Sequence, residues 1–185
     1  MRKIALLAAA LAASSLMTPA SALTMRDFMW SGYDPGELRG GPNGGRRLPT
    51  VVTGNPFAIP DGEFVRIVTQ AMSDDAVSAS RDQGVAARAP MRVLMMFNAA
   101  TYTGTRLCDR AQPLAIAPPQ GARPSGGPLN LVATYCRGDQ PLTQVITSFD
   151  ASDPSDPRLK NAIRQVTATL FPMTNPDRGG PNFPD

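Results

Sequence analysis

The side chains that could carry chemistry in this sequence are limited first by the absence of histidine. Histidine is the usual general base near neutral pH and the commonest metal ligand. This sequence therefore holds neither a Ser-His-Asp or Cys-His catalytic site nor a zinc site with histidine ligands. An enzyme built on it would have to use carboxylates, a Ser-Lys pair, tyrosine or arginine.

Three carboxylates lie within seven residues, at Asp150, Asp153 and Asp156. A calcium loop places oxygen ligands at alternate positions, has a glycine in mid-loop and closes with a glutamate. The spacing of three and three, without those features, is typical of turns and a helix cap. Asp74-Asp75 has the pattern of a solvated pair or a helix end. The sequence thus predicts no metal site and no cofactor.

A catalytic role would need a different arrangement of these groups. A Ser-Lys dyad would have to use Lys160, which falls on the polar side of the last predicted helix. Two acids converging in a pocket would support a small carboxylate-dependent hydrolase. We assign no catalytic residue, and this hydrolase stays open as an alternative function.

The two cysteines, Cys108 and Cys136, form an even pair. In an oxidising compartment such a pair predicts a disulfide, and chain entropy makes closing a loop of this length worth roughly 3–4 kcal/mol. A redox-active pair is the alternative, but the spacing is not the C-x-x-C that lowers a thiol pKa. We expect a structural disulfide.

The first 22 residues have the three parts of a secretory signal. Arg2 and Lys3 form a positive start, residues 4–17 are almost wholly apolar, and Ala20 and Ala22 give an A-x-A site for cleavage between Ala22 and Leu23. The apolar run is shorter than the roughly 20 residues that a membrane span needs. We predict export to the periplasm or the exterior, with no transmembrane segment after processing.

Processing also changes the charge. Removal of residues 1–22 from the 185 takes away two basic residues and no acidic one, which leaves 16 basic against 15 acidic residues. A nucleic-acid partner is therefore not expected, because such binders carry a large basic excess. An anion-binding module is a further alternative, if Arg92, Arg106 and Arg137 meet on one surface.

The elements that must position these groups are short and separated by Pro- and Gly-rich segments. An apolar face after Asp61 predicts a helix that reaches Met72, and Asp156-Pro157 begins a second helix that ends before Phe171. Met91–Asn98 predicts a strand buried on both faces, and 129–137 with 142–149 predicts a β-hairpin. Thr50–Thr53 is a possible short strand.

This order of elements favours an α+β fold, with a small antiparallel sheet, both helices on one face, one disulfide and long loops. We expect a flexible segment at 23–54, the domain at 55–172 and a disordered tail at 173–185. Trp30 and Tyr33 are candidates to anchor a partner, and the alternative is that Phe28, Met29 and Trp30 pin the N-terminal segment to the domain. Met72, Met91, Met95 and Met96 fill the core rather than line a groove. The remaining core residues expected are Val93, Phe97, Leu131, Ala133, Val145, Ile163, Val166 and Leu170.

Several short motifs resemble those of small uncharacterised exported proteins of bacteria. They are Gly54-Asn55-Pro56-Phe57, Met91–Asn98, Leu107-Cys108, Tyr135–Asp139 with Leu142-Thr143, and Leu170-Phe171-Pro172. The resemblance implies export and cysteine pairing and transfers no activity. The sequence is thus most consistent with a non-enzymatic accessory or interaction protein of the envelope, whose partner would be another envelope protein.

Overall fold

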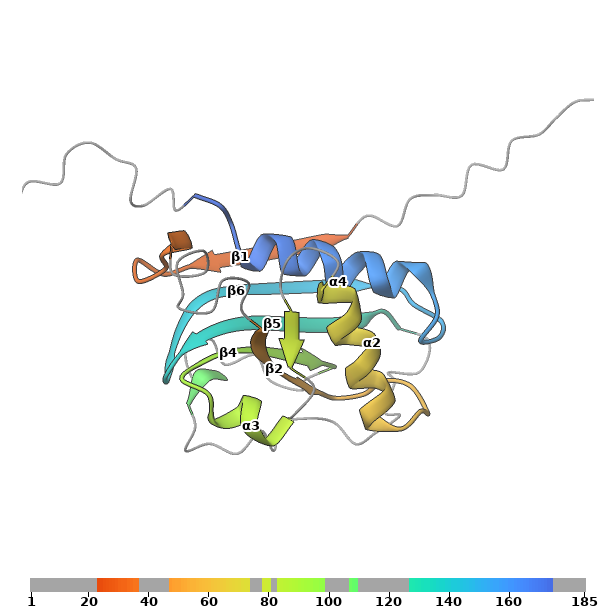
Figure 1. Cartoon of the computed structure of the whole chain (residues 1–185). Helices are drawn as coiled ribbons and strands as arrows, with labels where there is room; N and C mark the ends of the chain where they lie inside the picture. The colour runs from red at the N-terminus through yellow and green to blue at the C-terminus, as the bar shows by residue number, and fades with distance from the viewer. Residues whose placement is uncertain are drawn as a thin grey trace, which may run out of the picture.

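The computed structural model of the chain describes residues 23–36, 47–73, 78–80, 83–98, 107–109 and 127–174. These residues form a six-stranded sheet with helices on both faces (Figure 1). The predicted signal sequence, Asp74-Asp75, Arg106 and most of the predicted tail lie outside the described residues. The elements are β1 (Thr24–Met29), β2 (Arg47–Thr53), α2 (Asp61–Ser73), β3 (Ser78–Ser80), α3 (Gln83–Arg88), β4 (Met91–Phe97), β5 (Leu129–Arg137), β6 (Gln140–Phe149) and α4 (Pro157–Leu170).

The sheet has the strand order β1-β6-β5-β4-β2-β3. The α+β class is confirmed, and β6, β5 and β4 are antiparallel neighbours as predicted. β1, which was not predicted, adds to the sheet antiparallel to β6. The prediction of a wholly antiparallel sheet is wrong at β2, because Thr50–Thr53 pairs in parallel with Val93–Met96. The chain between β2 and β4 includes α2, and a helical crossover of this kind is what places two strands parallel.

The front face of the sheet, which carries Val93, Met95 and Phe97, is covered by α2 and α4 (Figure 1). Phe64 of α2 packs edge-on against Phe97, with 4.9 Å between ring centroids. All the predicted core residues from β4, β5, β6 and α4 are buried in this one cluster. The two helices therefore share one face of the sheet, as the sequence predicted.

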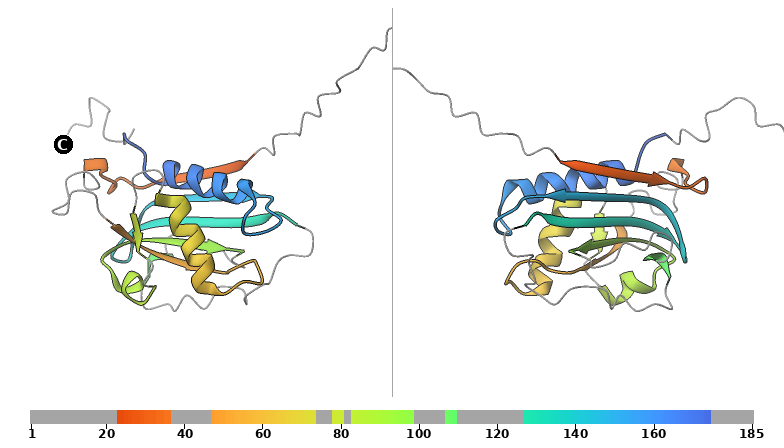
Figure 2. Two further views of the ribbon diagram at one scale, coloured as in Figure 1. Left: turned by 45° about the vertical axis from the view of Figure 1, so that its right-hand side comes forward. Right: turned by 180° about the vertical axis from the view of Figure 1, so that it is seen from behind.

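The back face of the sheet holds a second, smaller core, which confirms that β4 is buried on both faces, although the helix that covers this face was not predicted. Leu94 and Met96 of β4 alternate with the front-face residues and pack against Ala86 of α3 and Leu107. A third helix thus lies on the opposite side of the sheet from α2 and α4, as the view from behind shows (Figure 2). This explains why β4 is apolar at almost every position, since a strand covered on both faces loses the usual alternation.

The hairpin and the last helix form where the sequence predicted them. β5 and β6 pair from Leu129↔Phe149 to Arg137↔Gln140 around a turn in which Gly138 has a φ of 59°. Asp156 caps α4 by accepting a hydrogen bond from the Arg158 N–H, and Pro157 takes the first helical position. Proline suits that position because its missing N–H would have no partner in the helix.

The N-terminal segment differs from the flexible region expected at 23–54. Thr24–Met29 is a strand that pairs with β6, and Arg47–Thr53 is a strand inside the sheet. Polar residues interrupt the alternation in β1, and Pro49 lies inside β2. The run of β1 therefore lacks the pattern of a strand, and tertiary pairing decides its conformation. In β2, the possible short strand expected at Thr50–Thr53 is confirmed and begins earlier, at Arg47.

Gly54 joins β2 to the loop before α2 with a φ of +75°, and a Cβ added there would lie 2.0 Å from the carbonyl oxygen of Phe97. Gly54→Ala should therefore lower the free energy of unfolding by about 3 kcal/mol, through a strained backbone and a clash with β4. Chemical denaturation of the variant measures this change. Gly62→Ala is the matched control, since a Cβ there meets nothing within 4 Å; its effect should stay within about 1 kcal/mol. Equal losses in both variants would contradict the role of Gly54.

Candidate functional site: the edge strand β1

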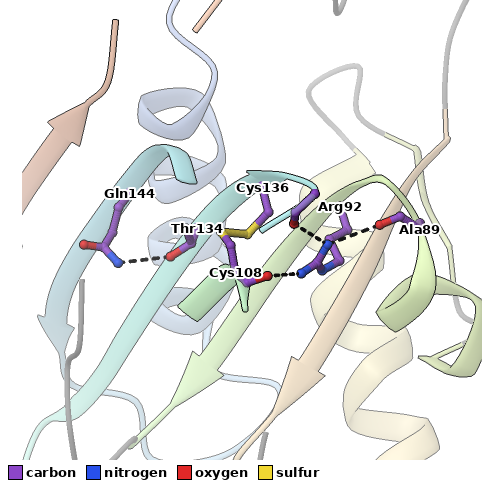
Figure 3. Close-up of a disulfide and its surroundings, with 7 residues drawn as sticks. Ala89, Arg92, Cys108, Thr134, Cys136 and Gln144 are labelled. Atoms are coloured by element: carbon purple, nitrogen blue, oxygen red, sulfur yellow. Dashed lines mark hydrogen bonds between the residues drawn. A yellow bond between two sulfur atoms is a disulfide. The ribbon is translucent and has the colours of Figure 1, made fainter. Parts of the chain in front are cut away.

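Cys108 and Cys136 form a disulfide, as predicted, with an S–S distance of 2.03 Å. Both residues are buried on the back face, where the bond ties the short turn at 107–108 to β5 (Figure 3). A buried disulfide that links a turn to a strand is a structural staple. Neither sulfur is placed for exchange with a substrate, because reactive cysteines are partly exposed.

Arg92 lies next to this disulfide, on β4 directly opposite Cys136. Its guanidinium donates hydrogen bonds to the carbonyl oxygens of Ala89 at 3.2 Å, Gly138 at 2.8 Å and Cys108 (Figure 3). The residue is only 3% exposed. Arg92 therefore joins the end of α3, the β5–β6 turn and the disulfide turn, and it is not the surface anion ligand that we considered.

Arg137 has a different environment from Arg92. Its guanidinium donates to the Gly32 carbonyl oxygen at 3.0 Å in an exposed hydrogen bond. This contact links β5 to the segment that follows β1. Arg92 is buried and Arg137 lies at the surface, so these two arginines do not share a binding surface.

The carboxylates before α4 have structural roles. Asp156 accepts hydrogen bonds from the Arg158 side chain and from the backbone of Arg158 and Ser152. Its contacts with Arg158 and Ser152 hold the pKa of Asp156 far below its ordinary value. Hydrogen bonds from Ser155 and then Ser152 lower the pKa of Asp153. A general acid needs a raised pKa, so neither group suits the acid role in the alternative hydrolase.

The remaining candidates are the lysine of the possible Ser-Lys dyad and the four methionines. Lys160 is exposed on α4, and Met72, Met95 and Met96 are buried in the two cores while Met91 packs against the front one. Core filling by these methionines is confirmed. Within the described ranges, no group of three His, Cys, Asp or Glu residues could hold a metal ion.

The aromatic residues near the N-terminus have two kinds of environment: some hold the segment to the sheet, and one is exposed. Tyr33 is fully buried, and its hydroxyl donates to the Pro172 carbonyl oxygen at 2.8 Å, just after α4. The Trp30 N–H donates to the Leu142 carbonyl oxygen of β6. Phe28, in contrast, is 47% exposed. Tyr33 and Trp30 therefore fix the segment to the sheet, and Phe28 faces away from the core.

The two edges of the sheet differ in whether other groups hydrogen-bond to the outer strand. On the outer side of β2, the short strand β3 pairs with residues 47–49. Further along β2, the Gln83 side-chain amide accepts a hydrogen bond from the Val52 N–H at 2.7 Å and donates one to the Thr50 carbonyl oxygen at 2.9 Å. The Gln83 amide thus continues the hydrogen bonding that a neighbouring strand would supply. This is a way to close an edge that could otherwise pair with another chain.

At the other edge, no described strand pairs with the outer side of β1. We call this side, from Thr24 to Met29, the β1 edge. Four of its six residues are exposed: Thr24, Arg26, Asp27 and Phe28. An uncovered strand edge offers a row of N–H and C=O groups for pairing with another strand. The β1 edge is therefore the candidate functional site among the described residues.

Sequence reasoning considered Trp30 and Tyr33 as possible anchors and Phe28 only as a residue that pins the segment, and it did not find the β1 edge. Six residues with Arg26 and Asp27 in the middle give no strand pattern, and a sheet edge is defined only by where the other strands lie. The only periodic signal in the run is Met25 and Met29 on one face of an extended chain, and the exposed Asp27 between them interrupts it.

Comparison with known proteins gives little beyond these observations. No protein-family model matches the chain, and no curated protein matches it. Among solved structures, a PelC dodecamer from Paraburkholderia phytofirmans with a leucine-to-methionine substitution has 10% identity and a TM-score of 0.42, over 81% of this chain and 98% of that chain. Another PelC dodecamer from this organism has 11% identity and a TM-score of 0.41, over 81% and 99%. In the described part of the chain, no helix is long and apolar enough to cross a membrane.

Replacement of Arg92 should destabilise the protein because three backbone carbonyls would lose a charged donor. We expect Arg92→Lys to lower the free energy of unfolding by about 2–4 kcal/mol, since an ammonium cannot span the three acceptors. Urea denaturation of the oxidised protein measures the loss. Arg137→Lys is the matched control with an exposed hydrogen bond, and its loss should be clearly smaller. If Arg92→Lys left the free energy of unfolding unchanged, the three hydrogen bonds would add no stability.

Asp156→Ala should lower the free energy of unfolding by about 1–2 kcal/mol at neutral pH, as the loss of a helix cap does. The pKa of Asp156 is lowered in the folded state, so its carboxylate stabilises the fold above the ordinary pKa of about 3.9. This stabilisation is lost as the pH falls through the acid range toward the lowered pKa. Thermal unfolding of both proteins from neutral to acid pH should show the difference narrowing. A difference that stays constant would contradict the cap, and the exposed Asp153→Ala should have the smaller effect.

Proposed function

We propose that this protein is exported and works in the periplasm or outside the cell as a non-enzymatic interaction module of the envelope, with the β1 edge as its contact surface. The single observation that carries the proposal is the difference between the two edges of the sheet. One edge is closed by β3 and Gln83, and along the other no strand among the described residues pairs with β1 on its outer side.

The disulfide supports the proposed location. Disulfides form and persist in oxidising compartments and are rare in the cytosol. Cys108 and Cys136 are fully buried in the bonded state, and the neighbouring Cys108 carbonyl is an acceptor for Arg92. A buried disulfide therefore supports folding in an oxidising compartment, in line with the predicted signal sequence at residues 1–22.

The structural use of the polar residues supports an interaction role over catalysis. The hydrogen bonds of three candidate groups, Arg92, Asp153 and Asp156, are all made within the fold, to turns, a helix cap and strand ends. The anion-binding alternative loses Arg92 as a surface group. The β1 edge, by contrast, presents exposed side chains of both charges beside an aromatic ring.

Site-specific photo-crosslinking in cells tests the function. With a photo-reactive amino acid in place of Phe28, the processed chain should give a discrete crosslinked band in the envelope fraction, since that side chain is exposed on β1. Val85 is the matched control, because it is 54% exposed on α3, which packs against β2 on the far side of the sheet from β1. The mass of the processed chain should correspond to a start at Leu23. An unprocessed cytoplasmic chain, or equal crosslinking at both positions, would refute the proposal.

A further inference from the structure

We infer that the β1 edge pairs with the β1 edge of a second copy of this chain, antiparallel and across a two-fold axis, so that the two sheets become one continuous sheet. This inference rests on the proposed function, because it names the partner of the same contact surface. The observations that carry it are the direction of the backbone groups of β1 and the order of its side chains.

The outward backbone groups of β1 follow from its pairing with β6. The Trp30 N–H points toward β6, since it donates to the Leu142 carbonyl oxygen at 3.0 Å. The Thr24 carbonyl points the same way and accepts from the Thr147 hydroxyl at 3.0 Å. In an antiparallel ladder the direction of these groups alternates along the strand. The N–H and C=O groups of Met25, Asp27 and Met29 therefore point outward.

The two-fold axis restricts the possible registers. Residues with outward backbone groups must pair with one another to form hydrogen bonds, so the axis passes through a residue and not between two residues. An axis at Arg26 would oppose Arg26 to its own copy, and an axis at Asp27 would oppose Asp27 to its own copy. Like charges directly opposite each other destabilise a strand pair.

An axis at Phe28 avoids both conflicts. It opposes the two Phe28 rings, and aromatic cross-strand pairs are stabilising. Arg26 then lies opposite Trp30 of the second copy, where a guanidinium can stack on an aromatic face. Asp27 lies opposite Met29 and makes backbone hydrogen bonds. An axis at Met25 would leave Phe28 uncovered, although its side chain is 47% exposed and is the large apolar side chain exposed on β1.

The charge of the chain permits such an association. The processed sequence has 16 basic and 15 acidic residues after loss of Arg2 and Lys3, so two copies repel each other little. The contact is small, because each copy contributes one six-residue strand. Small interfaces of this kind give weak complexes. The dimer should therefore form reversibly and depend on protein concentration.

Cysteine crosslinking of the purified, oxidised protein tests the register. In the proposed pairing, Phe28 and its copy form a non-hydrogen-bonded pair, with Cα atoms about 4.5 Å apart, within the range of a disulfide. Phe28→Cys should therefore form a covalent dimer about tenfold faster than Arg26→Cys or Asp27→Cys. The native cysteines do not interfere, since they are bonded to each other and buried. Faster crosslinking at either of the other two positions, or equal rates at all three, would overturn the register.

Proline substitution tests the pairing without a crosslink. Asp27→Pro removes an N–H that points away from β6, so the fold should persist while the edge can no longer pair. Asp27→Ala is the matched control, because it removes the charge and keeps the N–H. In sedimentation equilibrium over a range of concentrations, the unmodified protein and Asp27→Ala should approach twice the monomer mass, and Asp27→Pro should remain monomeric. An unmodified protein that is monomeric throughout, or an Asp27→Pro variant that dimerises equally, would overturn the inference.

Failure of this inference can be told apart from failure of the proposed function. If the purified protein is monomeric and Phe28 still crosslinks in cells to a protein of another mass, the pairing is wrong and the function stands. If neither experiment gives a contact at the β1 edge, both are wrong. Circular dichroism of Asp27→Pro confirms that a monomeric result comes from a folded protein.

Discussion

Burial of the central strands on both faces is the constraint on which the rest of the structure depends. β4 and β5 lie in the middle of the sheet and carry apolar side chains toward both sides. A single layer of helices would leave Leu94 and Met96 in water. The front is covered by α2 and α4, and the back by α3 together with the turn at Cys108. The disulfide and Arg92 are consequences of this second layer. They fix short segments that have too little apolar surface to dock by themselves.

Polar groups hold the ends of the elements in this arrangement. Thr143 of β6 donates to the Leu170 carbonyl oxygen at 2.6 Å, and the Tyr33 hydroxyl donates to that of Pro172. The C-terminal end of α4 is thus fixed to the sheet from two directions, and Asp156 caps its other end. On the back face, the buried Gln144 amide donates to the Thr134 hydroxyl at 3.1 Å (Figure 3). Buried polar groups need such partners, because an unpaired one costs about 1–3 kcal/mol.

The sequence predicted the elements whose residues repeat with a clear period or carry a clear cap. Leu159, Ile163 and Val166 mark one face of α4, Asp156-Pro157 marks its start, and the alternation in β5 marks the hairpin. The structure confirms each of these. The parallel β2–β4 pair was missed because a strand's partner is not encoded in its own periodicity. The β1 edge was missed for the same reason, since an edge exists only once the order of the strands is known.

The sequence by itself determined the α+β class, the pairing of the two cysteines and the absence of any histidine-based chemistry. These follow from composition and local pattern, which do not depend on how the chain closes. The tertiary structure alone decided that Arg92 lies buried against three carbonyls and that Asp153 and Asp156 stabilise a turn and a helix. It also decided that Gln83 closes one sheet edge, whereas no strand in the described part of the chain covers the other. Each of these is a contact between residues distant in the chain or a matter of burial, and a residue type does not specify its neighbours in space.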